Sequence, residues 1–201
     1  VYPNPVNIHS SWDMEGDTDL NFFSAIIDEM YKRYKIDKKR VYVSGFSWGG
    51  NFSYRLANNM ADKIAAIAPV MGHSWGNNPN VAKSTHPMPI LQITGINDDV
   101  FKPEYVQPIL DKWIEWNGCD KQGVETRPYP VGKPNSQAYK TLWKNDDTGV
   151  EVALIMTPQG HWVPVDPNSI YSNLEVWNFC KRYSLDSFKD DSSVPGITAD
   201  D

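Results

Sequence analysis

The sequence predicts an α/β protein whose mostly parallel sheet carries helices on both faces. Short apolar runs rich in β-branched and aromatic residues alternate along the 201 residues with segments that have helical apolar spacing. One such run, residues 40–44, leads into the glycine-rich turn Gly45-Phe-Ser-Trp-Gly49, and a helical pattern follows. In sheets of this kind, active-site loops lie at the carboxyl ends of the strands. We therefore expect the functional residues to follow the predicted strands.

The remaining elements follow from the same two patterns. Asp17-Thr-Asp-Leu20 opens a helix with an apolar face that runs to Tyr34. The turn between the last two strands is expected at residues 144–149. The expected strands are residues 40–44, 64–71, 89–94, 124–129, 139–143 and 151–156; the expected helices are residues 17–34, 51–58, 106–114 (after Pro103) and 169–183. Residues 72–85 are expected to form a loop at the active-site end.

Ser47 is the predicted nucleophile. Gly45-Phe-Ser-Trp-Gly49 fits the pattern Gly-x-Ser-x-Gly between a strand and a helix. In that setting the serine lies at the apex of a strained turn that exposes Oγ, and we expect small residues at both flanks because backbone packs against backbone. The N-terminus of the following helix favours negative charge nearby. The alternative is an ordinary serine in a glycine-rich turn.

His161 is the predicted base. In folds with this turn the partners of the serine follow in the order Asp or Glu, then His, each on a loop after a later strand. His161 follows the last predicted strand and a glycine, whereas His9, His73 and His86 all precede the acid loop. His73 follows the apolar run 64–71, one glycine later, and could line the site, but it precedes the acid.

Asp98 and Asp99 are the candidate acids, because both follow the predicted strand 89–94. One of them would accept a hydrogen bond from the imidazole Nδ1–H, and the other would be a turn residue or a solvated one. We favour Asp98 as the partner of the imidazole.

Three segments carry a family resemblance. The nucleophile segment reads Tyr42-Val-Ser-Gly-Phe-Ser-Trp-Gly-Gly-Asn-Phe-Ser-Tyr-Arg-Leu56, the acid loop reads Thr94-Gly-Ile-Asn-Asp-Asp-Val100, and the base segment reads Gly160-His-Trp-Val-Pro164. They resemble the polyhydroxybutyrate-depolymerase-like esterases, which belong with the feruloyl and acetylxylan esterases of carbohydrate esterase family 1. The resemblance runs from Val1 to about Tyr183 and implies an α/β-hydrolase fold with the acid at Asp98.

The resemblance also implies further site residues. In the resembled family a tryptophan near the position of Trp12 lies close to the site, so we expect a substrate contact from Trp12. We also expect substrate contacts from His73 and Trp162. One oxyanion donor is expected to be the backbone N–H of Trp48, directly after the nucleophile.

The chain departs from the family pattern in two places. The family's acid loop opens with histidine, where this chain has Thr94. The family also begins with several strands and a His-Gly loop that supplies a second oxyanion donor, whereas this chain begins at Val1-Tyr-Pro-Asn. We therefore expect a protein lacking its N-terminal part, with an open sheet edge through which molecules could associate.

Composition excludes several classes of function. A net charge of −6 argues against nucleic-acid or anionic-membrane partners. No apolar run approaches the roughly 18 residues of a membrane span. No metal-ligand cluster or phosphate-binding glycine motif occurs, so we expect no cofactor and no metal.

Cys119 and Cys180 could be separate buried thiols or one bridge. We expect a single catalytic domain over residues 1–188, followed by a polar tail or linker over residues 189–201.

The resemblance implies a secreted serine esterase that removes feruloyl or acetyl groups from plant cell-wall polysaccharide. Its partners would be esterified polysaccharides or oligosaccharides and small aromatic or acetyl esters. The 8 tryptophans offer stacking surfaces for such groups, although core packing explains most tryptophans. The alternatives are a serine peptidase on the same fold and a non-catalytic remnant that binds carbohydrate or packs against a partner.

Overall fold

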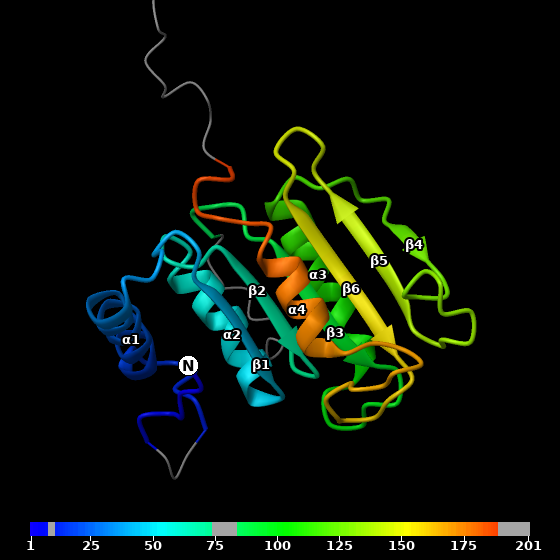
Figure 1. Ribbon diagram of the computed structural model, residues 1–201, viewed down its shortest axis with the longest axis horizontal. Helices are drawn as coiled ribbons and strands as arrows, with labels where there is room; N and C mark the ends of the chain where they lie inside the picture. Colours follow the sequence, from blue (N-terminus) through cyan, green and yellow to red (C-terminus); the bar gives the residue numbers. More distant parts are fainter. Residues whose placement is uncertain (8–10, 74–83, 189–201) are drawn as a thin grey trace, which may run out of the picture.

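The computed structural model describes residues 1–7, 11–73 and 84–188. These residues form a six-stranded sheet with the strand order β1-β2-β3-β6-β5-β4 (Figure 1). Strands β1, β2, β3 and β6 are parallel, whereas β5 and β4 are antiparallel to their neighbours. In chain order the elements are α1 (Thr18–Tyr34), β1 (Tyr42–Phe46), α2 (Trp48–Asn59), β2 (Ala66–Val70), β3 (Ile90–Gly95), a 3₁₀ turn (Pro103–Tyr105), α3 (Val106–Trp116), β4 (Val124–Thr126), β5 (Tyr139–Lys144), β6 (Glu151–Thr157) and α4 (Ser172–Cys180).

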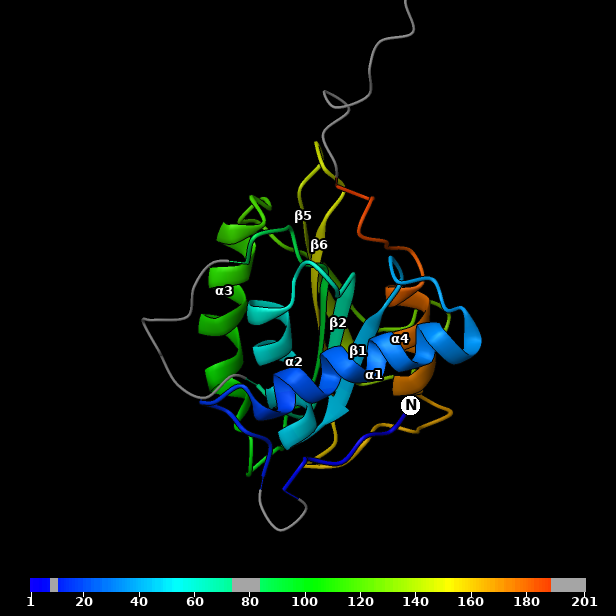
Figure 2. The same cartoon turned by 90° about the vertical axis from the view of Figure 1, so that its left-hand side faces the viewer.

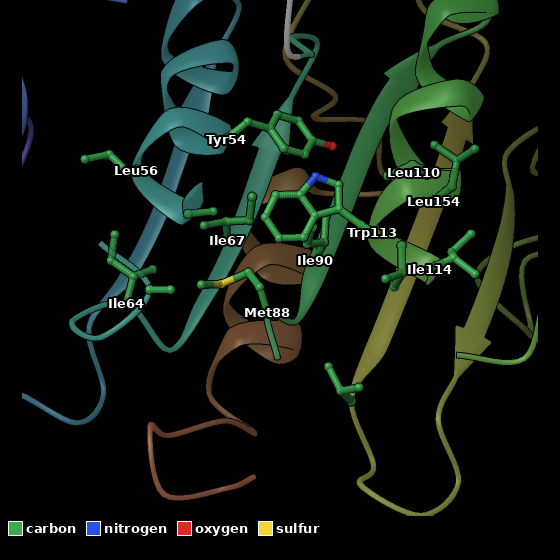
Figure 3. Packing of buried hydrophobic residues seen from close by; sticks show 14 of the residues in the cluster. Tyr54, Leu56, Ile64, Ile67, Met88, Ile90, Leu110, Trp113, Ile114 and Leu154 are labelled. Atoms are coloured by element: carbon green, nitrogen blue, oxygen red, sulfur yellow. The ribbon is translucent and has the colours of Figure 1, made fainter. Parts of the chain in front are cut away.

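Helices cover both faces of this sheet. Figure 2 shows α2 and α3 on one face and α4 on the other, with α1 on the side of β1. The core between the sheet and α2 and α3 contains Leu56, Ile67 and Trp113, all buried (Figure 3). A second core lies on the α4 side and includes Ile155 and Phe179. The predicted fold class, a mostly parallel sheet with helices on both faces, is confirmed.

The continuous apolar runs of the sequence arise because the central strands are buried on both faces. Successive side chains of a strand point to opposite faces. In β6, Leu154 packs into the core under α2 and α3, whereas its neighbour Ile155 packs into the core under α4. Both positions therefore require an apolar residue, which removes the alternating pattern of a half-exposed strand.

Three predicted elements are at least three residues shorter in the structure, and one of them, the strand expected over residues 64–71, spans Ala66–Val70. The strand expected over residues 124–129 ends at Thr126, since Arg127-Pro128 follows and proline has no N–H for the ladder. The helix expected over residues 169–183 begins only at Ser172, because Tyr171 is extended and pairs with Val165 in an isolated bridge. The predicted turn between the last two strands is confirmed, and its ends are joined by the bond from Asn145 N–H to Val150 O. Residues 74–83 of the predicted loop and the tail 189–201 lie outside the described residues.

Strand β1 forms one edge of the sheet. Backbone groups alternate in direction along a strand. Just before β1 the C=O of Val41 accepts from Ala65 N–H, and just after it the N–H of Ser47 donates to Val70 O. By that alternation the backbone groups of Tyr42, Ser44 and Phe46 face away from β2. Within the described residues no hydrogen bond of these outward groups occurs. A mostly apolar groove of about 920 Å³ follows this edge and reaches Ser47.

Candidate active site

Ser47 occupies the sharp turn between β1 and α2. Its backbone has φ 56° and ψ −120°, a conformation that costs a non-glycine residue energy, and its N–H is held by Val70 O at 2.9 Å. A Cβ on Gly45 would lie 2.4 Å from the carbonyl carbon of Gly49, so position 45 requires glycine. The expectation of a small residue at both flanks is wrong for Gly49, because a Cβ there meets nothing within 4 Å.

His161 links Ser47 to Asp98. Its Nε2 lies 2.9 Å from Ser47 Oγ, and its Nδ1 lies 2.9 Å and 3.1 Å from the two carboxylate oxygens of Asp98. The side chain of Asp98 is fully buried, whereas 17% of the His161 side chain is exposed. The structure therefore brings together the three side chains expected from the order of the sequence. In this arrangement the imidazole can take a proton from the serine while the carboxylate holds Nδ1 as the protonated nitrogen.

Backbone donors fix the carboxylate of Asp98. Its Oδ1 accepts hydrogen bonds from the N–H groups of Val100 and Phe101, at 2.9 Å and 2.8 Å. The neighbouring Asp99 is exposed at the surface of the same loop. Of the two candidate acids, it is Asp98 that bonds to His161.

The loops that carry Asp98 and His161 are joined by their backbones. Asn97 N–H donates to Gln159 O at 3.1 Å, and Ile96 N–H donates to Thr157 O at 2.8 Å. A Cβ on Gly95 would lie 2.4 Å from Gln159 O, so glycine at this position permits the close approach. Since β3 and β6 are adjacent and parallel, the residues that follow them meet at the same edge of the sheet.

Two phenylalanines that the sequence analysis missed flank the imidazole. The ring of Phe101 stacks on His161 with centroids 5.7 Å apart and planes inclined by 23°. The ring of Phe46 lies 4.9 Å away at 36°. Phe46 is the second residue of the Gly-x-Ser-x-Gly turn and Phe101 follows the acid loop. An apolar residue inside one motif and another directly after the acid loop were the only signals available for them.

The other predicted site residues lie at different distances from the chemistry. Trp48 is the first residue of α2, where backbone N–H groups are directed out of the helix end. Trp12 lines the same groove as Ser47 and stacks on Phe52 at 4.9 Å, so its ring is partly used in packing. His73 is buried, and its ring lies nearly perpendicular to that of Phe101 with the centroids 5.1 Å apart. Trp162 is 70% exposed and directly follows His161 in the chain.

Cys119 and Cys180 are both buried and both free, which decides between the two alternatives for these cysteines. Each contributes to a different core. Burial raises the pKa of the Cys119 thiol to about 11 and that of Cys180 to about 12.

Over residues 1–7, 11–73 and 84–188, no three His, Cys, Asp or Glu side chains gather as metal ligands would. In the same part of the chain no helix has the length and apolarity needed to cross a bilayer.

The fold and the serine turn at the carboxyl end of β1 define an α/β hydrolase. The chain belongs to the dienelactone hydrolase family, whose model matches residues 8–120. It is 36% identical over 190 residues to a bifunctional acetylxylan esterase/xylanase of Neocallimastix patriciarum, covering 92% of this chain and 26% of that protein. It is 24% identical over 191 residues to feruloyl esterase D of Neurospora crassa, covering 92% of this chain and 62% of that protein. The predicted resemblance to acetylxylan and feruloyl esterases is confirmed.

Solved structures agree on the fold. The acetyl xylan esterase of Aspergillus awamori superimposes with a TM-score of 0.60 over 85% of this chain and 73% of that chain, at 16% identity. The carboxylesterase of Bacillus cereus gives a TM-score of 0.52 over 79% and 61%, at 14% identity. The chain spans less than two thirds of the length of the two sequence relatives described above.

Proposed function

We propose that the chain is a serine carboxylic-ester hydrolase with Ser47 as nucleophile, His161 as base and Asp98 as the acid that orients the base. The observation that carries the proposal is the continuous chain of hydrogen bonds from Ser47 Oγ through both nitrogens of His161 to Asp98. Its distances lie in the range needed for proton transfer between nucleophile and base. Residues 1–188 would form this catalytic domain, with residues 189–201 as a polar tail.

The reaction would proceed by two acyl transfers. His161 Nε2 takes the proton of Ser47 as Oγ attacks the ester carbonyl, and the resulting imidazolium gives that proton to the leaving alcohol. A water molecule then attacks the acyl-enzyme and loses a proton to Nε2, which returns it to Ser47 as the acid product leaves. In both halves the negative oxygen would be stabilised by the N–H of Trp48, together with the positive end of the α2 dipole.

The surroundings of the imidazole support this role. Phe46 and Phe101 pack beside the ring and restrict its orientation, while the buried carboxylate of Asp98 selects the tautomer with a proton on Nδ1. Nε2 is then left unprotonated and directed at Ser47. The proposed substrate contacts are Trp12, His73 and Trp162. Trp12 lines the groove, His73 contacts Phe101, and Trp162 directly follows His161 in the chain.

We propose acetyl or feruloyl esters on plant cell-wall polysaccharide as the substrate class, together with small acetyl or aromatic esters. The support is the activity for which the relatives are named, since they are acetylxylan and feruloyl esterases. A polysaccharide substrate is consistent with a secreted protein, and secretion is part of the proposal. No cofactor enters the proposed reaction.

A fluorophosphonate probe tests the nucleophile. We expect labelling of Ser47 in the wild-type protein and none in Ser47→Ala, because the probe requires an activated serine. Ser44→Ala serves as the matched control three residues earlier on β1 and should be labelled like the wild type. Labelling that persists in Ser47→Ala would refute the assignment. No labelling of the wild type would favour the non-catalytic alternative.

Comparing three substrates on one preparation tests the reaction class. We expect turnover of methyl ferulate or acetylated xylan to exceed turnover of a peptide p-nitroanilide. An esterase site must stabilise the same tetrahedral oxyanion as a peptidase, so only the leaving group and the binding surface separate the two classes. Faster cleavage of the anilide than of both esters would contradict the esterase proposal and favour the peptidase alternative.

We also propose that the open edge of β1 associates with the β1 edge of a second copy of this chain. The outward backbone groups of Tyr42, Ser44 and Phe46 would then be paired between the two copies. The edge itself has none of the usual protective residues, since β1 contains no lysine, no proline and no other charged residue. The groove beside it is mostly apolar, so association would also remove apolar surface from water.

A further inference from the structure

A buried network of polar side chains lies directly behind the serine turn. The hydroxyl of Tyr54 on α2 lies 2.8 Å from Oε1 of Gln92 on β3. Nε2 of Gln92 lies 3.1 Å from Gly72 O, 3.1 Å from Ile93 O and 3.0 Å from Thr94 Oγ1. Tyr54, Gln92 and Thr94 are each 1% exposed or less. A buried amide costs stability unless its bonds are made, and here both ends of the amide are satisfied.

The orientation of the Gln92 amide follows from its partners. The carbonyls of Gly72 and Ile93 can only accept hydrogen bonds, so the NH₂ group must face them and Oε1 must face Tyr54. Burial raises the pKa of Tyr54, which therefore remains a protonated donor. Figure 3 shows the Tyr54 ring beside Trp113 in the core. This core lies on the side of the sheet that α2 and α3 cover. Tyr54 and Gly72 thus fix opposite ends of the same amide.

Gly72, the backbone partner of this amide, packs on the serine turn. A Cβ on Gly72 would lie 2.0 Å from Ser47 O and 3.0 Å from Asn51 N, so the two backbones are in direct contact. The preceding Met71 has φ 48°, an uncommon value for this residue type, and its N–H is held by Ile93 O at 2.8 Å. The segment 71–73 is therefore held against the turn that carries Ser47, and the Gln92 amide holds it from behind.

We propose that Gln92 and Tyr54 are positioning residues for Ser47. Tyr54 orients the Gln92 amide, the amide fixes the carbonyl of Gly72, and Gly72 supports the strained backbone of Ser47 at the distance from His161 that proton transfer requires. Gly72 also precedes His73, which contacts Phe101 beside the imidazole. The inference rests on the proposed role of Ser47 as nucleophile, because it concerns how that residue is held.

Two substitutions of Gln92 separate the hydrogen bond from the packing. Gln92→Met keeps the length of the side chain and removes the donor at every pH. Gln92→Glu keeps an acceptor for Tyr54, but its carboxylate turns an oxygen toward Gly72 O. When protonated, that glutamic acid can donate to Gly72 O again, and burial raises the pKa of a glutamate into a range that can be measured.

The readouts are the rate of fluorophosphonate labelling of Ser47 and kcat for p-nitrophenyl acetate, each as a ratio to the wild type at the same pH. We expect both variants to lose about 10-fold to 100-fold near pH 8, the scale on which small misplacements of reacting groups slow catalysis. The ratio should rise for Gln92→Glu as the pH falls toward about 5 and stay flat for Gln92→Met. Tyr54→Phe, which removes one oxygen atom, should slow labelling by a smaller factor.

Asn117 provides the matched control at the other end of β3. Its buried amide bonds to both the N–H and the C=O of Met88, far from the carboxyl end of the strand. Asn117→Asp should lower the melting temperature yet leave the labelling rate of the folded protein and its pH ratio unchanged. A general loss of stability would therefore be distinguished from misplacement of Ser47.

The outcomes separate the two proposals. If the wild type is labelled and folded Gln92→Met and Tyr54→Phe are labelled at the wild-type rate, the positioning proposal is wrong and the proposed function stands. An equal loss in Gln92→Met and Gln92→Glu at every pH also overturns it, since packing would then explain both. If the wild type itself is not labelled at Ser47, the proposed function fails and takes this proposal with it.

Discussion

The ring of Phe101 stacks on the imidazole of His161, with the centroids 5.7 Å apart and the planes 23° from parallel. Phe101 is 5% exposed and its own backbone N–H donates to Asp98. A single residue thus holds Asp98 through its backbone and His161 through its side chain. Phe101 therefore connects the acid loop to the base loop in addition to the direct bond between Asp98 and His161.

Replacing Phe101 by leucine should slow ester hydrolysis by about 10-fold, because the imidazole gains freedom to rotate away from Ser47 while the backbone bond to Asp98 remains. The measurement is kcat for p-nitrophenyl acetate in folded protein. Phe179→Leu is the control, since Phe179 is similarly buried but lies in the core under α4. Equal losses in the two variants would show that Phe101 contributes only packing.

Asp98→Asn and Asp99→Asn form a matched pair one residue apart. The amide introduced by Asp98→Asn can present an N–H to Nδ1 and so favour the wrong tautomer of His161. A loss on the order of 10⁴ in kcat is typical when a triad acid is replaced in this way. Asp99 is exposed, so Asp99→Asn should retain activity near that of the wild type. A greater loss in Asp99→Asn than in Asp98→Asn would contradict the proposed acid.

Much of the site could be predicted because its chemistry depends on residue type and chain order. Ser47 was identified by its glycine-rich turn, and His161 was the only histidine that followed the acid loop. Asp98 was favoured as one of two acids after the strand 89–94, the resemblance also placed the acid there, and the bonds from Asp98 to Nδ1 agree with that choice. The fold followed from continuous apolar runs, since strands buried on both faces need apolar residues at every position.

The supporting residues could not be predicted because their roles arise only from tertiary contacts. Phe101 and Gln92 lie in a loop and a strand where sequence pattern predicts packing, and neither carries a motif. Two element boundaries also depend on local details. β4 ends before Pro128, which has no N–H, and α4 begins only after Tyr171, which pairs with Val165 in a bridge. The periodicity of apolar residues cannot reveal the role of a single residue that bonds to a distant part of the chain.

The two cysteines should be nearly inert in the folded protein. With a pKa of about 11, Cys119 is ionised in only about one molecule in 10³ at pH 8, and Cys180, with a pKa of about 12, in fewer. Alkylation by iodoacetamide should therefore be slow in buffer and fast for both thiols in urea, as followed by mass spectrometry. Fast alkylation of the native protein, or a mass that reports a disulfide, would contradict this expectation.

The same thiols make stability depend on pH. Burial raises their pKa above the unfolded value of about 8.5, so the folded state favours the protonated form. Their stabilising contribution should be fully present below about pH 8.5 and should be lost as the pH rises through about 11 and about 12. The urea midpoint of Cys119→Ala should therefore fall less between about pH 8 and about pH 11 than that of the wild type. Parallel declines in the two proteins would refute the assignment.

A lysine on β1 tests association through the open edge of the sheet. Ser44 is exposed on this strand, and its backbone groups face away from β2 by the alternation of the ladder. If two copies pair through β1, sedimentation of the wild type should show a dimer that grows with concentration. Ser44→Lys should reduce the dimer, because two copies would bring ammonium groups together at the shared edge. Charged residues are one of the ways in which proteins protect edge strands.

Gln107→Lys adds the same charge to the exposed face of α3 and should leave the dimer unchanged. A wild type that stays monomeric at every concentration, or a dimer equally resistant to both lysines, would place the association surface elsewhere or remove it.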